Sequence, residues 1–142
     1  GLWPVLADNL MRKHGVARVH PLDEITLLMD RFREHIQVIA AQVDGAVEAG
    51  IVLFLGQTVA HAQYIAASER AYAVNALDLL FEEAVMRAFR SGKRYFDFGI
   101  STEDGGRTLN EGLAQFKNEF GAGGVVHEFY ELNLKGAGNA SE

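Results

Sequence analysis

The sequence predicts a mixed α/β fold in which a mostly antiparallel sheet carries helices on both faces. Three apolar stretches between residues 36 and 67 are separated by very short turns, which predicts an antiparallel meander. The apolar residues then recur at helical spacing between positions 74 and 88. A further short strand follows, so that a crossover helix joins it to the meander. The predicted order of elements is ααβββαβαβ.

Two helices are predicted before the meander. The first spans residues 4–14 and ends at Gly15, a residue type that commonly terminates helices. The second spans residues 22–32, with Asp23 and Glu24 in its first turn and basic residues in its last. This distribution of charge is the one that the helix dipole favours.

The meander is predicted from its turns. Strands over residues 36–43 and 46–55 flank Asp44 and Gly45, a pair that strongly favours a hairpin. A third strand, over residues 58–67, follows the next short turn. The three strands are therefore expected to lie side by side in chain order.

The second half of the chain is predicted to alternate helices and strands. The crossover helix over residues 74–88 leads to an apolar strand over residues 95–100. A helix over residues 109–120 is expected to stop at Gly121. The apolar alternation over residues 124–134 predicts a last strand.

Length and composition indicate one globular domain. The chain has 142 residues, of which 49% are hydrophobic and 23% charged. We expect a single domain over residues 1–134 and a flexible tail over residues 135–142. The sequence has no cysteine, which excludes disulfides, thiolate metal sites and cysteine nucleophiles. The histidines lack metal-ligand spacing, so no metal site is predicted.

The charge and the hydropathy pattern exclude several classes of partner. A net charge of −6 argues against general nucleic-acid binding. No apolar run is long enough for a transmembrane helix, and no signal peptide is visible, so we expect a cytoplasmic protein. The chain begins with Gly1 rather than Met, which is consistent with an excised piece that lacks an N-terminal domain. The apolar meander strands offer an edge for a homodimer.

The polar segment after the strand over residues 95–100 is the first candidate site. It gathers many polar side chains where an α/β sheet commonly holds its ligand, at the carboxyl end of a strand. The candidates for substrate or cofactor contact in this segment are Ser101, Thr102, Arg107, Asn110 and Glu111. Helix capping is an equally good explanation for Asn110.

Polar residues within the predicted strands are further candidates. Asp97 interrupts an apolar strand, where a carboxylate acts as a general base or pairs with a neighbouring group. Strict alternation places His61 and Gln63 on one face of the third strand, and Tyr64 and Ala66 on the other. His61 and Gln63 are therefore candidates to contact a substrate, with a hydrogen-bonded structural histidine as the alternative.

The order of elements resembles the GNAT acyltransferase fold, over about residues 22–134. Two segments narrow the resemblance: FDFGIST, and LNEGLAQFKNEFGA further on, are similar to the DFG-S and FK-x-x-(F/W)-G signatures of the FemAB-like branch. In this superfamily the sheet splays between the third meander strand and the strand after the crossover helix. The resemblance implies that acyl-coenzyme A inserts there.

The resemblance also implies which residues hold the donor. The third strand offers backbone N–H groups to the thioester arm, and the following loop binds the pyrophosphate. The positions that correspond are Tyr64, Ile65, Ala66, Ala67, Ser68, Arg70, Ala73, Asn75 and, before the later helix, Asn110. Ala73 and Asn75 replace glycines of the usual Q/R-x-x-G-x-G/A loop. The donor is therefore either acetyl-CoA or another acyl-CoA, or aminoacyl-tRNA as in some FemAB-like enzymes.

The predicted function is an acyltransferase that moves an acetyl or aminoacyl group to an amine. The resemblance places Lys117 where many GNAT enzymes have a tyrosine, so Lys117 is expected to stabilise developing negative charge. Asp97 or Glu111 is expected to act as the base. The acceptor is a small-molecule or cell-envelope amine. The alternative is a degenerate, non-catalytic module that forms half of a two-domain or dimeric protein.

Overall fold

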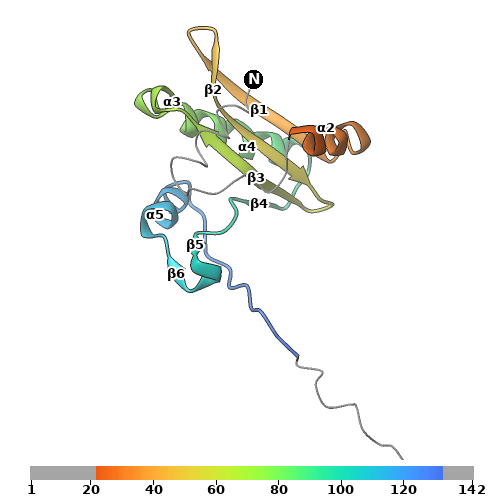
Figure 1. Ribbon diagram of the computed structural model, residues 1–142, viewed down its shortest axis with the longest axis vertical. Helices are drawn as coiled ribbons and strands as arrows, with labels where there is room; N and C mark the ends of the chain where they lie inside the picture. The colour runs from red at the N-terminus through yellow and green to blue at the C-terminus, as the bar shows by residue number, and fades with distance from the viewer. Residues whose placement is uncertain (1–21, 133–142) are drawn as a thin grey trace, which may run out of the picture. The chain divides into compact units, whose positions relative to one another are not determined.

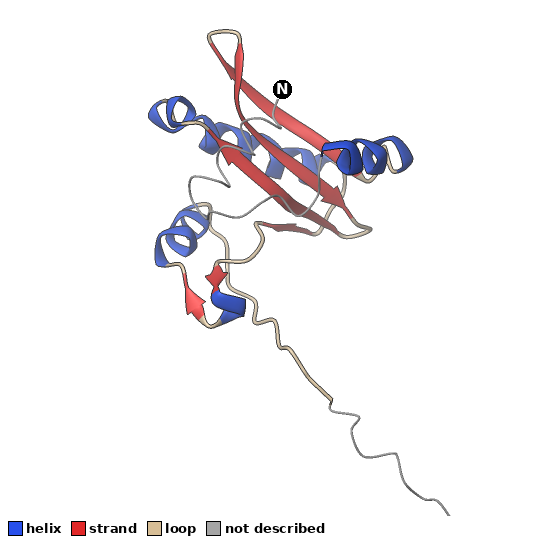
Figure 2. Ribbon diagram, viewed as in Figure 1, coloured by secondary structure: helices blue, strands red, loops and turns tan. Residues whose placement is uncertain are grey.

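The computed structural model describes residues 22–132 of the chain (Figures 1 and 2). They fall into two compact units, which meet in sequence after Ile100. The helix expected over residues 4–14 and the tail expected over residues 135–142 lie outside the described residues. Each unit is described by itself below.

The first unit is a four-stranded sheet with helices on both faces, as the sequence predicts. The sheet order is β1-β2-β3-β4, with antiparallel pairs from β1 to β3 and a parallel pair between β3 and β4. Helix α2 lies on one face and α4 crosses the other (Figure 1). The elements in chain order are α2 (Leu22–Arg31), β1 (Ile36–Val43), β2 (Ala46–Leu55), β3 (Val59–Ala67), α3 (Glu69–Ala73), α4 (Ala76–Arg90) and β4 (Tyr95–Asp97).

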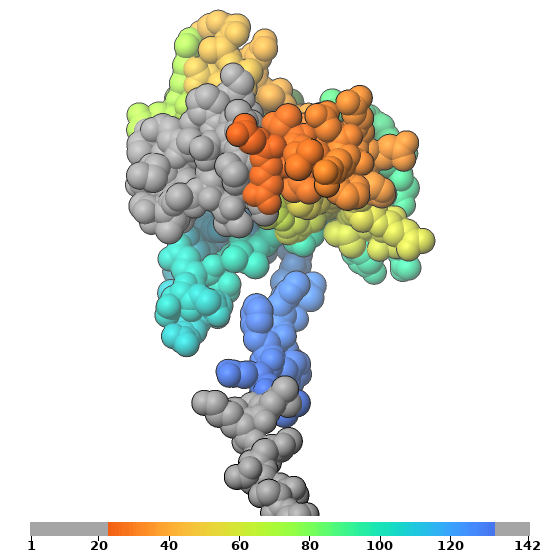
Figure 3. All heavy atoms as spheres, turned by 45° about the vertical axis from the view of Figure 1, so that its right-hand side comes forward, coloured from red at the N-terminus to blue at the C-terminus, as the bar shows by residue number. Residues whose placement is uncertain are grey.

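Helix α2 packs against the sheet through one apolar face. Its Ile25 joins a buried cluster with Ile36, Val52 and Ala66 from β1, β2 and β3. Partly buried apolar side chains surround that cluster: Leu28, Met29, Phe54 and Tyr64. The opposite face of α2 is exposed and carries Asp23, Asp30 and the apolar Leu27, which is 48% exposed; Figure 3 shows the helix at the molecular surface. An amphipathic helix of this kind is held mainly by the apolar area that it buries.

Helix α4 fixes β4 from the other face of the sheet. Its buried side chains recur at helical spacing: Ala76, Leu77, Leu80, Phe81, Ala84 and Ala88. The ring of Phe81, which is fully buried, lies 5.1 Å from the ring of Phe98 and 6.3 Å from that of Phe96. Burying one such ring stabilises the fold by about 1.5–3 kcal/mol. The three rings therefore hold the short strand β4 in place.

The crossover between β3 and β4 contains two helices where the sequence predicts one. Asn75 separates α3 from α4 and adopts the left-handed conformation, with φ 53° and ψ 36°. Such a residue interrupts the helical backbone, which explains the break. The helix predicted over residues 74–88 corresponds to α4, and α3 lies in the segment that the sequence predicts as a loop.

Strand β3 contains an irregularity that changes the expected faces. Val52 of β2 pairs with Tyr64, but the next residue of β2 pairs with Ala62, so Gln63 is skipped. An extra residue of this kind inverts the alternation beyond it. His61 pairs with Phe54, and Tyr64 pairs with Val52 on the same face. The expectation that His61 and Tyr64 lie on opposite faces is therefore wrong.

The second unit begins with a small hairpin that the sequence does not predict. Strands β5 (Thr102–Glu103) and β6 (Thr108–Leu109) pair around the 3₁₀ turn η1 (Asp104–Gly106). Helix α5 (Glu111–Glu119) follows, in place of the longer helix expected over residues 109–120. The stop expected at Gly121 is confirmed, because Gly121 has a φ of +80° that ends the helix.

Two strand predictions need correction. β4 ends at Asp97 rather than at residue 100, because Gly99 has a φ of +78° and turns the chain. The strand expected over residues 124–134 is absent from its described part, residues 124–132. Five apolar side chains there are 81–87% exposed: Val125, Val126, Phe129, Tyr130 and Leu132. Alternation gives a segment the propensity for a strand, but a strand forms only when a neighbour supplies hydrogen bonds.

None of the helices within residues 22–132 combines the length and the apolar character that a membrane span requires.

Candidate functional site

The candidate site lies where the parallel pairing between β3 and β4 ends. The parallel pairing joins Val59 to Tyr95, Ala60 to Phe96 and His61 to Asp97, and then stops. β3 nevertheless continues to Ala67. Among the described strands, none pairs with this edge of β3 beyond His61. The pairing thus ends between the two strands that the resemblance names, the third meander strand and the strand after the crossover helix.

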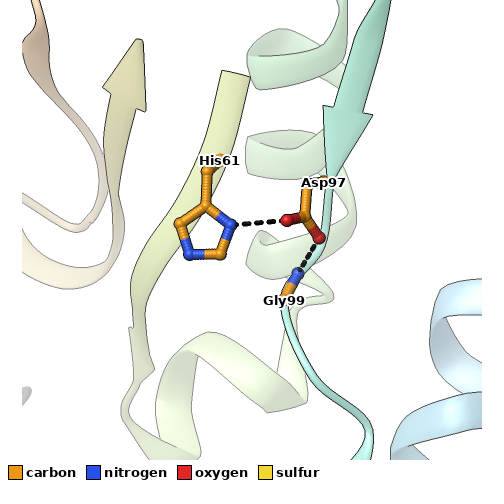
Figure 4. Close-up of polar contacts among 3 residues, drawn as sticks. All are labelled: His61, Asp97 and Gly99. Carbon is orange, nitrogen blue, oxygen red and sulfur yellow. Dashed lines mark hydrogen bonds and ion pairs between the residues drawn. The ribbon is translucent and has the colours of Figure 1, made fainter. Parts of the chain in front are cut away.

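His61 and Asp97 form the polar contact at this point. Nδ1 of His61 lies 2.8 Å from Oδ2 of Asp97 (Figure 4). An ionised carboxylate only accepts hydrogen bonds, so the imidazole Nδ1 must carry the proton and donate it. The neutral ring then has its lone pair on Nε2. The contact therefore selects one of the two tautomers of His61.

The second carboxylate oxygen of Asp97 is bonded within its own loop. Oδ1 of Asp97 accepts a hydrogen bond of 2.8 Å from the backbone N–H of Gly99 (Figure 4). The positive φ of Gly99 makes this tight turn possible. A Cβ at that position would lie 3.5 Å from the carbonyl oxygen of Ala62 and 3.9 Å from Cε1 of His61. The Asp-Phe-Gly sequence thus holds the carboxylate against the histidine.

The imidazole of His61 is only partly buried. Its side chain is 35% exposed, and that of Asp97 is 45% exposed. Nε2 lies on the side of the ring away from Asp97 (Figure 4), and no group within residues 22–132 forms a hydrogen bond with it. A histidine with a fixed ring and an accessible Nε2 lone pair can accept a proton from a bound molecule.

The loop after β3 is held by local contacts. The Ser68 hydroxyl caps α3 by accepting the N–H of Ala71 at 3.1 Å. Arg70, which the sequence assigns to the cofactor, forms an ion pair with Asp44 in the β1–β2 turn. Both partners are exposed, and such pairs contribute at most about 1 kcal/mol. A phosphate can therefore compete for Arg70 at small cost.

Asn75 takes the conformation that the replaced glycine would favour. Left-handed backbone is costly for most residues, but asparagine tolerates it best after glycine. With its φ of 53°, Asn75 precedes the first turn of α4, which has no side-chain cap from Asn75. Ala73 is the last residue of α3 and is helical. Asn75 thus has a left-handed backbone, a conformation that glycine also adopts readily.

The remaining cofactor candidates lie along β3 and its end. Tyr64 and Ile65 are half-buried, and Ala66 and Ala67 are buried. Gln63, the skipped residue in the register, is also half-buried. These residues follow His61 on the stretch of β3 that β4 does not pair.

Asn110 and Arg107 form their contacts with nearby residues of the second unit. Asn110 caps α5, because its Oδ1 accepts the N–H of Leu113 at 2.9 Å, and its Nδ2 donates to Glu103 at 2.7 Å. The backbone N–H of Asn110 also donates to the carbonyl oxygen of Ser101 at 2.9 Å. Arg107 lies 4.0 Å from Asp104. These contacts explain much of the polar character of the segment without a ligand.

Three further candidates in this unit differ in exposure. Thr102 is half-buried in β5, and Glu111 is exposed in the first turn of α5, where its charge favours the helix dipole. Lys117 is 6% exposed and is the one charged residue classed as buried within residues 22–132. A buried ammonium group is kept only where other groups compensate its charge. Lys117 is therefore not a solvent-exposed surface lysine.

Sequence reasoning named both members of the His61–Asp97 pair but not the pair itself. The two residues are 36 positions apart. Only the parallel register between β3 and β4 brings them together, and no local pattern reports a register. A metal site is not indicated, since the described residues contain no group of three or more potential ligands.

The comparisons with known proteins agree with this fold. The profile of the Acetyltransferase (GNAT) domain matches residues 2–117. An aminoglycoside acetyltransferase from an uncultured soil metagenomic sample, solved in complex with trehalose, has a similar structure. The TM-score is 0.64 at 11% identity, over 92% of this chain and 88% of that one.

A second solved structure is also similar. It is an integron cassette protein from the mobile metagenome of V. cholerae, with a TM-score of 0.57 at 15% identity, over 92% of this chain and 83% of that one. No curated protein matches the chain. At such low identities the two structures show the fold alone, whereas the family profile covers most of the sequence. The chain therefore belongs to the GNAT acetyltransferase domain family.

Proposed function

We propose that this domain moves an acetyl or aminoacyl group from a thioester or ester donor to an amine, with acetyl-CoA or another acyl-CoA as the donor. The observation that carries the proposal is the early end of the β3–β4 pairing. Strand β3 continues to Ala67, whereas its pairing with β4 ends at His61. The edge of a strand can bind an extended ligand through backbone N–H and C=O groups.

The loop between β3 and α4 supports a phosphate-bearing donor. Backbone N–H groups at the start of a helix attract anions, and α4 is 15 residues long. Asn75 gives its backbone the left-handed geometry that glycine gives in the usual loop. We propose that the backbone of Tyr64 to Ala67, together with Ser68, Arg70, Ala73 and Asn75, holds the donor. Asn110 is a further proposed contact.

The proposed reaction needs two proton transfers. The acceptor arrives as an ammonium ion and must lose one proton before its nitrogen attacks the acyl carbon. The new C–N bond forms, the bond to the leaving group breaks, and the leaving thiolate takes a second proton from the same nitrogen. We propose that Lys117 stabilises the intermediate oxyanion. Asp97 and Glu111 are the carboxylates that the sequence offers for the first proton transfer.

The proposed acceptor is a small molecule with a primary amine. One structural neighbour is described as an aminoglycoside acetyltransferase, and the net charge of −6 of this chain attracts cations. We propose Gln63, Ser101, Thr102 and Arg107 as further contacts. Membership of the FemAB-like branch, an aminoacyl-tRNA donor, a cell-envelope acceptor, a homodimer and a cytoplasmic location stay predictions from the sequence.

Calorimetric titration with acetyl-CoA tests the donor. We expect micromolar binding that Asn75→Gly preserves and Asn75→Val abolishes, because a β-branched residue strongly disfavours positive φ. Arg70→Ala should weaken the binding if the arginine exchanges Asp44 for a phosphate. Asp44→Asn is the matched control, since it frees Arg70 and should leave binding equal or tighter.

Two results would contradict the proposal. No binding at millimolar acetyl-CoA would favour an aminoacyl-tRNA donor or the non-catalytic module. Binding without transfer to any amine would favour the non-catalytic module alone. Lys117→Met and Glu111→Gln test the proposed roles directly, and full transfer by both variants would show that these two assignments are wrong.

A further inference from the structure

We infer that His61 accepts the proton of the acceptor amine and that Asp97 acts through it, as a positioning residue. The inference rests on the proposed acyl transfer and names the residue for its first proton transfer. Its basis is the contact of 2.8 Å between Nδ1 of His61 and Oδ2 of Asp97. This contact joins the last paired positions of β3 and β4.

The hydrogen bonds assign different roles to the two side chains. Asp97 uses one oxygen for His61 and the other for the N–H of Gly99, each at 2.8 Å. These two bonds fix the plane of the carboxylate, which in turn fixes the imidazole ring. The Nε2 lone pair of His61 has no hydrogen-bond partner within residues 22–132 and lies opposite the contact (Figure 4).

The surroundings of the His61 ring are compatible with proton transfer from a bound amine. The side chain of His61 is 35% exposed, so part of the ring is open to solvent while the strand holds it. His61 has two partners in the sheet register, Phe54 of β2 and Asp97 of β4. Asp97 is the charged one of the two. Glu111, the competing carboxylate, is exposed in the first turn of a helix in the second unit.

The step balances without any further reactant. The proton moves from the ammonium nitrogen to Nε2 of His61, which becomes an imidazolium ion beside the Asp97 carboxylate. The freed lone pair forms the C–N bond with the acyl carbon. The C–S bond then breaks, and the leaving thiolate takes the second proton of the nitrogen. The imidazolium ion returns its proton to solvent before the next turnover.

The test compares three variants in steady-state transfer from acetyl-CoA. The acceptors are a fixed panel of spermidine, glucosamine, kanamycin and a lysine-containing peptide. We expect His61→Gln to lower kcat by about a hundredfold to ten-thousandfold, the usual contribution of a general base, with little change in acetyl-CoA binding. His35→Gln is the matched control and should keep full activity, since Nδ1 of His35 contacts only a backbone carbonyl, that of Leu55 at 2.9 Å.

Asp97→Asn separates positioning from a purely structural role. Its amide can donate to Nδ1, which would move the ring proton to Nε2 and remove the lone pair. We expect a similar fall in kcat and a change of tautomer in the ¹⁵N NMR spectrum of the His61 ring. The signals of residues far from His61 should be the same in Asp97→Asn as in the wild type, because the fold is expected to be unchanged.

Three results would overturn the inference. If His61→Gln keeps its kcat while the wild type transfers acetyl groups, His61 is not the base and the proposed function stands. If the wild-type NMR spectrum shows the proton on Nε2, the positioning by Asp97 is wrong whatever the activity. If the wild type binds acetyl-CoA but acetylates no amine in the panel, the proposed function and the inference fall together.

Discussion

Two polar regions of this chain differ in how their side chains are engaged. The segment from Ser101 to Glu111 is dense in polar residues, and its capping and hairpin contacts join neighbours in sequence. The junction of β3 and β4 has far fewer, yet His61 and Asp97 meet there from two separate strands. Polar groups that are close in sequence readily satisfy each other locally. Polar side chains that separate strands hold in fixed orientations can instead form hydrogen bonds with a substrate.

The two regions also differ in how deeply their aromatic side chains are buried. The junction is backed by the buried ring of Phe81, which packs on Phe96 and Phe98. The second unit relies on contacts such as that between Phe116 and Phe120, whose ring centroids are 5.3 Å apart on half-buried side chains. A site needs side chains held by their surroundings, and the junction meets that requirement more fully.

The largest effect is expected from Phe81→Ala. The substitution leaves a cavity beneath β4, and such a change in a core costs about 3–5 kcal/mol of unfolding free energy. Urea denaturation followed by circular dichroism measures the loss. Phe116→Ala is the control in the second unit and should cost clearly less, because Phe116 is only half-buried. Equal losses would mean that the two regions are packed equally well.

Gly99→Ala is expected to have a smaller effect on stability. Alanine at the positive φ of Gly99 costs about 1–2 kcal/mol. Gly92→Ala is a matched control, because Gly92 has a φ of +72° and no atom within 4 Å of an added Cβ. The two variants should lose similar stability, but only Gly99→Ala should shift the NMR signals of the His61 ring, since Gly99 donates to Asp97. Unchanged His61 signals would argue that the turn does not position the carboxylate.

The smallest effect is expected in the polar segment, from Asn110→Ala. Removing this helix cap should cost about 1 kcal/mol of unfolding free energy. Asn110→Asp keeps the acceptor oxygen for the N–H of Leu113 and should restore most of the loss, although it gives up the bond to Glu103. Thermal unfolding of the three proteins tests the prediction. A loss that Asn110→Asp fails to restore would show that capping is not the main role of this side chain.

Part of the architecture was predictable because it depends on local chemistry. The Asp44-Gly45 turn specifies the first hairpin, and the apolar spacing over α4 specifies a helix. Gly121 ends α5 at the expected residue. The mixed α/β fold follows from these signals and is confirmed by the structure.

Two of the errors have one cause, which is that alternation does not specify pairing. The residues of segment 124–132 alternate, but no strand pairs with them in the described chain. The register shift at Gln63 reverses the faces of β3 without any signal in the sequence. The short helix α3 is a separate error, because it forms in a segment that the sequence predicts as a loop.

By itself, the sequence determined the order of the elements, the family to which the chain belongs and the identity of each polar candidate. Those properties follow from turn residues, periodicity and motif, which act over a few neighbouring residues. Only the tertiary structure decided that His61 and Asp97 touch, which oxygen of Asp97 faces the ring and which nitrogen is left open. The reason is that strand register and backbone twist come from packing across the whole sheet, and no local pattern encodes them.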